Sequence, residues 1–178
     1  LDTDLVFGFI ALFALLFCSA LVSGAEVALF SLSQKDIEDT LQEDPSKGKI
    51  ISKLLEKPKK LLATLLVANN FINIGVIILF SYLGHQLFSA ISSTTLKFSI
   101  EVIIATFLIL LFGEIVPKVY AGRNSNKFAL RIAYPIAFLD KLLSPISLPM
   151  RKATIYLHNK LGKQKTNFSV DQLSQALE

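Results

Sequence analysis

The sequence predicts an all-α membrane protein with three transmembrane helices, proline-bent short helices and cytoplasmic juxtamembrane helices. Of its 178 residues, 52% are hydrophobic, and the mean hydropathy is +0.55. The apolar residues form long blocks, not the narrow stripes of amphipathic helices. Residues 5–25 and residues 61–84 carry no charged side chain. Each block reaches the roughly 20 residues that an α-helix needs to cross a hydrocarbon core of about 30 Å.

Three spans are expected, over about residues 5–31, 61–84 and 98–121. The third span is long enough, although it contains two glutamates and a lysine. The first block is not typical of a cleaved signal peptide, because Asp2 and Asp4 precede it in place of a basic region and because its apolar run is too long.

The basic residues predict the orientation of the spans. Residues 34–60 hold seven lysines, residues 85–97 hold one, and ten more basic residues lie between residues 118 and 165. Basic loops stay on the cytoplasmic side of a membrane. The chain is therefore expected to cross the membrane with its N-terminus outside and its C-terminus in the cytoplasm. The basic residues are not interleaved with exposed aromatic residues, so no nucleic-acid partner is expected.

Residues 34–57 mix charges of both signs with apolar residues. They predict a pair of short juxtamembrane helices that are broken near Asp44 and Pro45. A solvated, charged connector is an equally good interpretation.

Residues 128–150 are apolar but contain Arg131, Asp140 and three prolines. Charges at the centre of a lipid-facing span are costly, so interfacial or re-entrant helices are favoured over a fourth span. Residues 1–150 are then one transmembrane domain. Residues 151–178 are expected to form a basic cytoplasmic helix and a linker, which stops abruptly and indicates a piece of a longer protein.

Polar residues recur at helical spacing inside the first two spans. Ser19, Ser23 and Glu26 follow the pattern i, i+4, i+7, which places them on one face of the first helix. Asn70 and Asn73 share a face of the second helix. Such groups need partners in a bilayer, so their clustering indicates either helix packing or a site.

The third span adds a glutamate beside a proline. Pro117 has no N–H, so the carbonyl of Gly113 loses its partner in a regular helix, next to the carboxylate of Glu114. Carboxylate and carbonyl oxygens are the ligands that Mg²⁺ prefers, and transporters use broken helices in this way. At about 1.5 Å per residue, the polar groups of all three spans reach the central-to-cytoplasmic layers. They can meet in one inward-facing cavity.

Each of these residues also has a simpler interpretation. Membrane serines often bond their own backbone, and asparagines such as Asn69 often hold helices together. Glu26 fits the headgroup level, and Glu114 is spaced to pair with Lys118 one turn later. If all of these hold, the chain is a membrane scaffold or sensor module. An enzyme is not expected, because the sequence has no nucleophile–base pair and no glycine-rich phosphate loop.

Three segments carry a family resemblance: SGAEVALFSLS (residues 23–33), LLATLLVANNFINIG (residues 61–75) and GEIVPKVYAGRN (residues 113–124). They resemble the signatures of the membrane domain, often called DUF21, of the CNNM/CorC family. The chain is also similar to a bacterial branch associated with gliding motility. The resemblance implies a homodimer that exports Mg²⁺, in some members in exchange for Na⁺. It also implies that a CBS-domain pair, which binds ATP, follows the end of this sequence.

The resemblance implies a cation site as well. Its ligands would be Ser19 and Ser23 of the first span, Asn70 and Asn73 of the second, and the Gly113 carbonyl with the Glu114 carboxylate of the third. Glu26 belongs to the bacterial form of the first motif, as a ligand or as a support.

Overall fold

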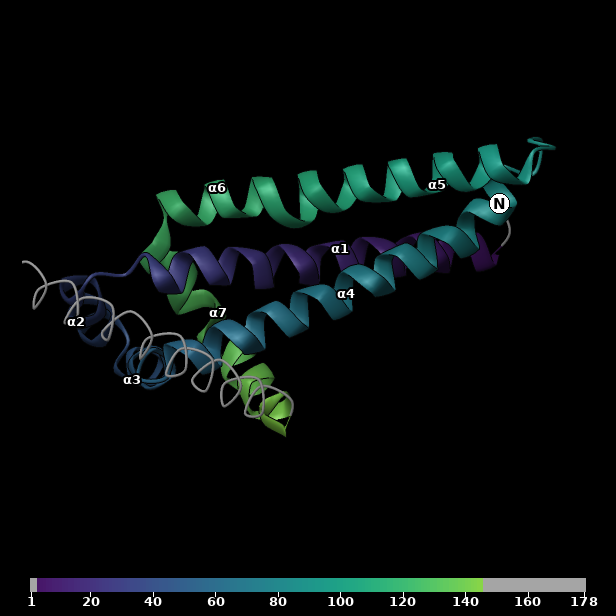
Figure 1. Ribbon diagram of the computed structural model, residues 1–178. Helices are drawn as coiled ribbons and strands as arrows, with labels where there is room; N and C mark the ends of the chain where they lie inside the picture. The colour runs from purple at the N-terminus through teal and green to yellow at the C-terminus, as the bar shows by residue number, and fades with distance from the viewer. Residues whose placement is uncertain (1–2, 146–178) are drawn as a thin grey trace, which may run out of the picture.

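The computed structural model of the protein describes residues 3–145, which fold into helices without a strand (Figure 1). This confirms the predicted all-α class. Three helices are long and apolar enough to cross a membrane, namely α1 (Thr3–Phe30), α4 (Pro58–Leu87) and a continuous helix over Thr94–Arg123. Each is a few residues longer than its predicted span at one or both ends.

The third long helix changes its hydrogen-bond pattern along its length. It comprises α5 (Thr94–Leu108), a π-helical segment η1 (Ile109–Ile115) and α6 (Val116–Arg123). The hydroxyl of Ser93 caps its start by accepting a hydrogen bond from Leu96 N at 3.4 Å. The buried side of this helix recurs at every fourth position, at Glu101, Ala105, Ile109, Gly113, Pro117 and Ala121.

Two short helices, α2 (Gln34–Glu43) and α3 (Pro45–Leu55), form a hairpin after α1. Asp44 separates them, as predicted, and its carboxylate accepts hydrogen bonds from Ser46 N and Lys47 N at 3.1 Å. A capping box between Ser33 and Asp36 starts α2, and these hydrogen bonds lower the pKa of the Asp36 carboxyl. The local sequence thus determines both helix starts.

The last described helix, α7 (Ser125–Leu142), contains Pro135 and buries an apolar face. Near its C-terminal end, Asp140 accepts from Lys60 Nζ at 2.5 Å and from Thr64 Oγ1 at 3.1 Å, which ties α7 to the start of α4. The depth of α7 relative to a bilayer stays a prediction. The predicted basic helix and linker over residues 151–178 lie outside the described residues.

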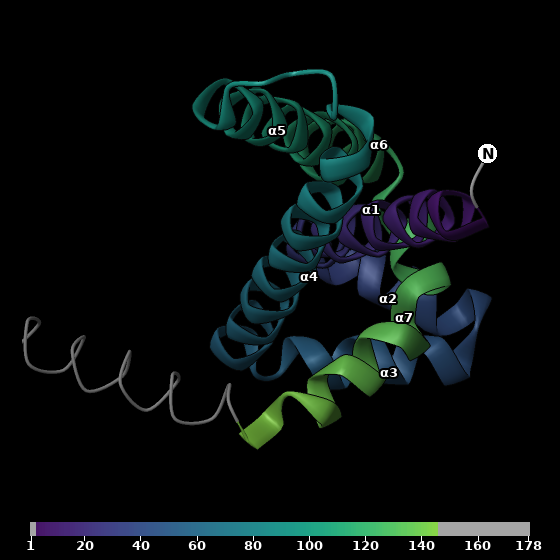
Figure 2. The ribbon, with the colours of Figure 1, turned by 90° about the vertical axis from the view of Figure 1, so that its right-hand side faces the viewer.

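The three long helices run side by side, and α2, α3 and α7 gather at the end opposite the N-terminus (Figure 1). Seen along the long helices, α7 lies against α3 and α1 (Figure 2). One apolar core joins the long helices to α3 and α7, and a second lies farther along α1, α4 and α5.

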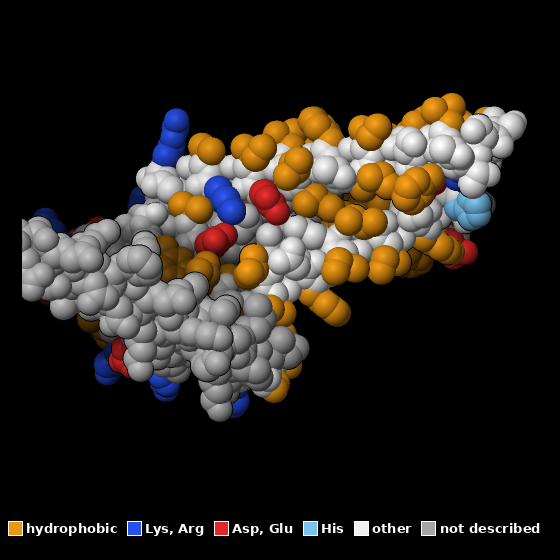
Figure 3. Space-filling view, viewed as in Figure 1, with side chains coloured by type: hydrophobic (Ala, Val, Ile, Leu, Met, Phe, Trp, Pro, Cys, Tyr) orange, Lys and Arg blue, Asp and Glu red, His pale blue; other side chains and the backbone are white. Residues whose placement is uncertain are grey.

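Large apolar side chains also cover the outside of the long helices (Figure 3), among them Phe13 and Phe71, which are 68% and 78% exposed. Monomeric soluble proteins rarely expose so large an apolar surface, whereas a bilayer covers it. In Figure 3, one small group of acidic and basic side chains interrupts this surface near the end that carries the short helices.

Candidate functional site

A polar cluster lies where α1, α4 and η1 meet. The hydroxyl of Ser19, which is fully buried, lies 3.0 Å from Asn69 Oδ1 and 2.7 Å from Asn73 Oδ1. The amide groups of the same two asparagines donate to Glu114 Oε1, each at 3.4 Å. Asn69 and Asn73 of α4 thereby connect Ser19 of α1 to Glu114 of η1.

Gly113 lets η1 approach α1 at this point. A Cβ atom there would lie 2.9 Å from Ser19 Oγ, closer than side chains normally pack. Gly113 is buried, and Glu114 follows it within the π-helical segment. π-helical turns occur frequently at functional sites. Pro117, which follows at the start of α6, supplies no N–H and so deprives the Gly113 carbonyl of its α-helical partner.

Glu114 is the only acidic member of this cluster. Both of its contacts fall on Oε1 and are long for hydrogen bonds. Lys118, spaced one turn from Glu114, reaches across to α1 and pairs with Glu26 Oε2 at 3.2 Å. The carboxylate of Glu114 is therefore held by neutral amides and not by an opposite charge.

Ser23 lies one turn after Ser19 on α1 and is 1% exposed. Its hydroxyl oxygen has no hydrogen-bond partner among the described residues. A buried hydroxyl without a partner costs about 1–3 kcal/mol. Proteins accept such a cost where the group serves a ligand or a conformational change, so Ser23 marks a candidate contact.

Asn70 and Glu26 lie apart from the hydrogen-bonded group. The exposed Asn70 side chain donates to Leu66 O of its own helix at 2.9 Å. Glu26 forms its ion pair with Lys118, and its side chain is 37% exposed.

The structure places Asn69 in the hydrogen-bonded cluster, whereas Asn70 lies outside it. The sequence left the role of Asn69 open between helix packing and the site. The spacing of four residues between Asn69 and Asn73 is the signal that points to it, because residues i and i+4 share a helix face as well as residues i and i+3 do.

The cluster brings together one carboxylate, one hydroxyl and two side-chain amides, and the buried Ser23 hydroxyl lies one helical turn along α1 from Ser19. This set of oxygen donors suits hard cations such as Mg²⁺. Within residues 3–145, no three His, Cys, Asp or Glu side chains lie together as a metal site. Glu114 is the acidic residue in the hydrogen-bonded cluster, so it would supply the charged ligand.

We expect the two serines to differ when each is replaced by alanine in protein free of divalent cations. Ser19→Ala leaves the asparagine oxygens unpaired and should lower the free energy of unfolding by about 1–3 kcal/mol. Ser23→Ala removes a buried hydroxyl that has no partner and should be neutral or stabilising. Unfolding of detergent-purified protein in SDS measures both, and equal losses would contradict the assignment.

Three apolar helices that converge on an intramembrane polar cluster define a multi-pass membrane protein. The chain belongs to the CNNM family, because residues 9–178 match its cyclin M transmembrane N-terminal domain. It is 32% identical over 170 residues, or 93% of the chain, to a UPF0053 protein of Haemophilus influenzae. It is 29% identical to the UPF0053 inner membrane protein YfjD of Escherichia coli over 74% of the chain. It is 28% identical to the metal transporter cnnm-4 of Caenorhabditis elegans over 90% of the chain.

The matched regions span 39%, 29% and 33% of these three relatives, respectively. The chain therefore corresponds to less than half of each of these proteins.

Proposed function

We propose that the protein carries divalent cations, specifically Mg²⁺, out of the cell across the bacterial inner membrane. The observation that carries this proposal is Glu114, an intramembrane carboxylate whose hydrogen-bond partners among the described residues are the neutral amides of Asn69 and Asn73. Ionisable residues inside membrane spans are costly, and ion pathways are among the functions that they mark. A relative named as a metal transporter supports the same class of cargo.

In this proposal Mg²⁺ enters from the end that carries the short helices. It exchanges part of its water shell for Glu114, the Gly113 carbonyl and Ser23 Oγ. The side chains of Asn69 and Asn73 can each turn the amide oxygen toward the ion, since an amide offers an acceptor on one side and a donor on the other. Mg²⁺ holds water tightly, so it keeps several water ligands.

Asn70 and Glu26 remain proposed members of the site on weaker grounds. Asn70 needs a rotation of α4 to face the cluster, because its side chain lies outside it. Glu26 acts as a support by holding Lys118 away from Glu114.

We propose a homodimer in the lipid bilayer, with the N-terminus outside and the short helices in the cytoplasm. We further propose that the protein exchanges Mg²⁺ for Na⁺, and that ATP regulates this transport by binding to a CBS pair that follows the membrane domain.

One observation favours a second candidate, a membrane scaffold. The Ser19, Asn69, Asn73 and Glu114 side chains already hydrogen-bond one another without an ion. In that case the cluster is helix-packing glue, and the protein does not respond to Mg²⁺.

Thermal unfolding distinguishes the two functions. The chain has no tryptophan, so circular dichroism of the purified protein in detergent is the appropriate readout. If the protein binds Mg²⁺ for transport, Mg²⁺ adds RT ln(1 + [L]/Kd) to the free energy of unfolding. The unfolding temperature should then rise with the logarithm of the Mg²⁺ concentration above the Kd. Ca²⁺ and Na⁺ at equal ionic strength should have smaller effects. Release of Mg²⁺ from loaded proteoliposomes then tests movement itself. An unfolding temperature that is independent of Mg²⁺ favours the scaffold.

A further inference from the structure

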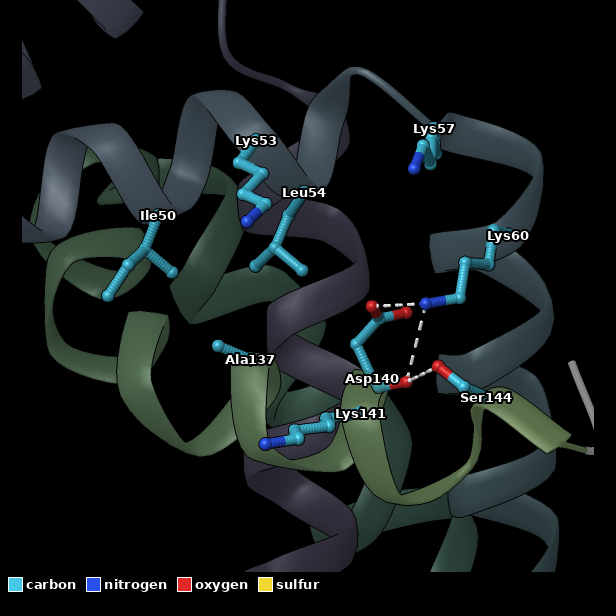
Figure 4. A pocket seen from close by; sticks show the side chains of 9 residues that line it. All are labelled: Ile50, Lys53, Leu54, Lys57, Lys60, Ala137, Asp140, Lys141 and Ser144. Atoms are coloured by element: carbon cyan, nitrogen blue, oxygen red, sulfur yellow. Dashed lines mark hydrogen bonds and ion pairs between the residues drawn. The ribbon is translucent and has the colours of Figure 1, made fainter.

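A second polar region lies at the start of α4, away from the cluster. It is a pocket of about 390 Å³ between α3, α4 and α7 (Figure 4). Four lysines line it from different segments: Lys53 from α3, Lys57 from the turn before α4, Lys60 from α4 and Lys141 from α7. Segments that are far apart in the sequence thus bring one type of charge to one cavity.

The pocket carries a net positive charge. Asp140 is its only acidic lining residue, so four lysines and one aspartate leave a formal charge of +3. Asp140 is already engaged by Lys60 Nζ at 2.5 Å. Among the described residues, no carboxylate lies within 4 Å of the amino groups of Lys53, Lys57 or Lys141. In the part of the chain that the structure describes, three cationic groups are therefore left without a carboxylate partner and could bind an anion.

The pocket also lies at the edge of a membrane span. Lys57 directly precedes Pro58, where α4 begins, Lys60 lies in the first turn of α4, and the charge-free block starts at Leu61. This position corresponds to the level of lipid headgroups, whichever way the chain is oriented. Apolar side chains, including the buried Leu54, form another part of the wall. A ligand that is anionic at one end and apolar at the other would contact both.

We propose that this pocket binds the headgroup phosphate of an anionic phospholipid. The lysines bind the phosphate, and the apolar wall contacts the glycerol and the first carbons of the acyl chains. Basic pockets beside membrane helices recognise acidic lipids through this combination. A free phosphate offers the same charge but makes no use of the apolar wall. The bound lipid would bridge α3 and α7 at the start of α4.

The test uses the purified chain in a neutral detergent at constant ionic strength. Three probes are titrated during thermal unfolding: dioctanoyl phosphatidylglycerol, dioctanoyl phosphatidylcholine and glycerol 3-phosphate. The test variant is Lys53→Gln/Lys57→Gln/Lys141→Gln, which keeps the Lys60–Asp140 pair. The matched control, Lys35→Gln/Lys49→Gln/Lys59→Gln, removes the same charge from exposed lysines that do not line the pocket.

Phosphatidylglycerol should bind the unmodified protein at least about tenfold more tightly than either other probe. One lysine near an acidic lipid surface contributes about 1 kcal/mol, or about fivefold. The test variant should therefore lose about tenfold to 100-fold in affinity, the control less than about threefold, and arginine at the three test positions should preserve binding. Equal losses of lipid affinity in the test and control variants would overturn the proposed binding pocket. The lipid would then be attracted by the overall surface charge. Glycerol 3-phosphate binding as tightly as the lipid would overturn the lipid assignment in favour of a free anion.

Discussion

Replacing Glu114 with glutamine should sharply weaken the binding of Mg²⁺ to the protein while leaving it folded. Glutamine keeps the shape of the side chain and its Oε1, so Asn69 and Asn73 can still donate to it. The variant lacks only the charge that a divalent cation needs among otherwise neutral ligands. We expect Mg²⁺ affinity to fall at least about tenfold, which is about 1.4 kcal/mol. Thermal unfolding with and without Mg²⁺, and release from proteoliposomes, measure the loss.

Glu101→Gln is the matched control for this experiment. Glu101 is also a carboxylate of the third long helix, but it lies in α5 and accepts from Ser81 Oγ at 3.3 Å. Its variant should respond to Mg²⁺ as the unmodified protein does. Unchanged Mg²⁺ affinity in Glu114→Gln would refute the proposed site, and a loss only in that variant supports it.

Replacing Gly48 with alanine should open the hairpin of α2 and α3. A Cβ atom at Gly48 would lie 2.6 Å from Leu41 Cα, 2.8 Å from Leu41 N and 2.9 Å from Thr40 O. All three atoms belong to the backbone, so no side-chain rotation relieves the contact. Inserted bulk of this kind costs about 1–3 kcal/mol or more. A lower unfolding temperature and faster amide hydrogen exchange over residues 34–55 are expected.

Gly122→Ala provides the comparison, because a Cβ atom there meets only Val27 Cγ1, at an ordinary 3.5 Å. Alanine favours a helix interior over glycine by up to about 1 kcal/mol, so this variant should be neutral or stabilising. Similar behaviour of the two variants would show that the hairpin tolerates a wider separation than the structure has.

The three spans and the helix break at Asp44 follow from the sequence because each depends on local properties. Apolar blocks of sufficient length predict spans, and an aspartate before a proline caps a new helix. The choice between Asn69 and Asn70 depends on which face of α4 points inward. Lipid and protein interior are both apolar, so hydrophobic periodicity does not distinguish those faces in a membrane helix.

Pairings between segments were equally hard to predict. Lys118 has a carboxylate one turn away on its own helix, but it pairs with Glu26 of α1. Glu101 has no sequence neighbour that explains its burial. The explanation is Gly84 of α4, where a Cβ atom would lie 2.6 Å from Glu101 Oε1. Only the packing of two helices brings these atoms together.

The π-helical segment affects which way the buried side of the third long helix faces along its length. An α-helix turns about 100° per residue, so a step of four residues overshoots a full turn by about 40°. Five such steps lead from Glu101 to Ala121, and in a regular α-helix they would carry the inward side round by about 200°. The π-helical turn holds more residues, so it delays this rotation. The third long helix can thereby pack its buried side against α4 near its start and against α1 near its end, over a length that crosses a bilayer.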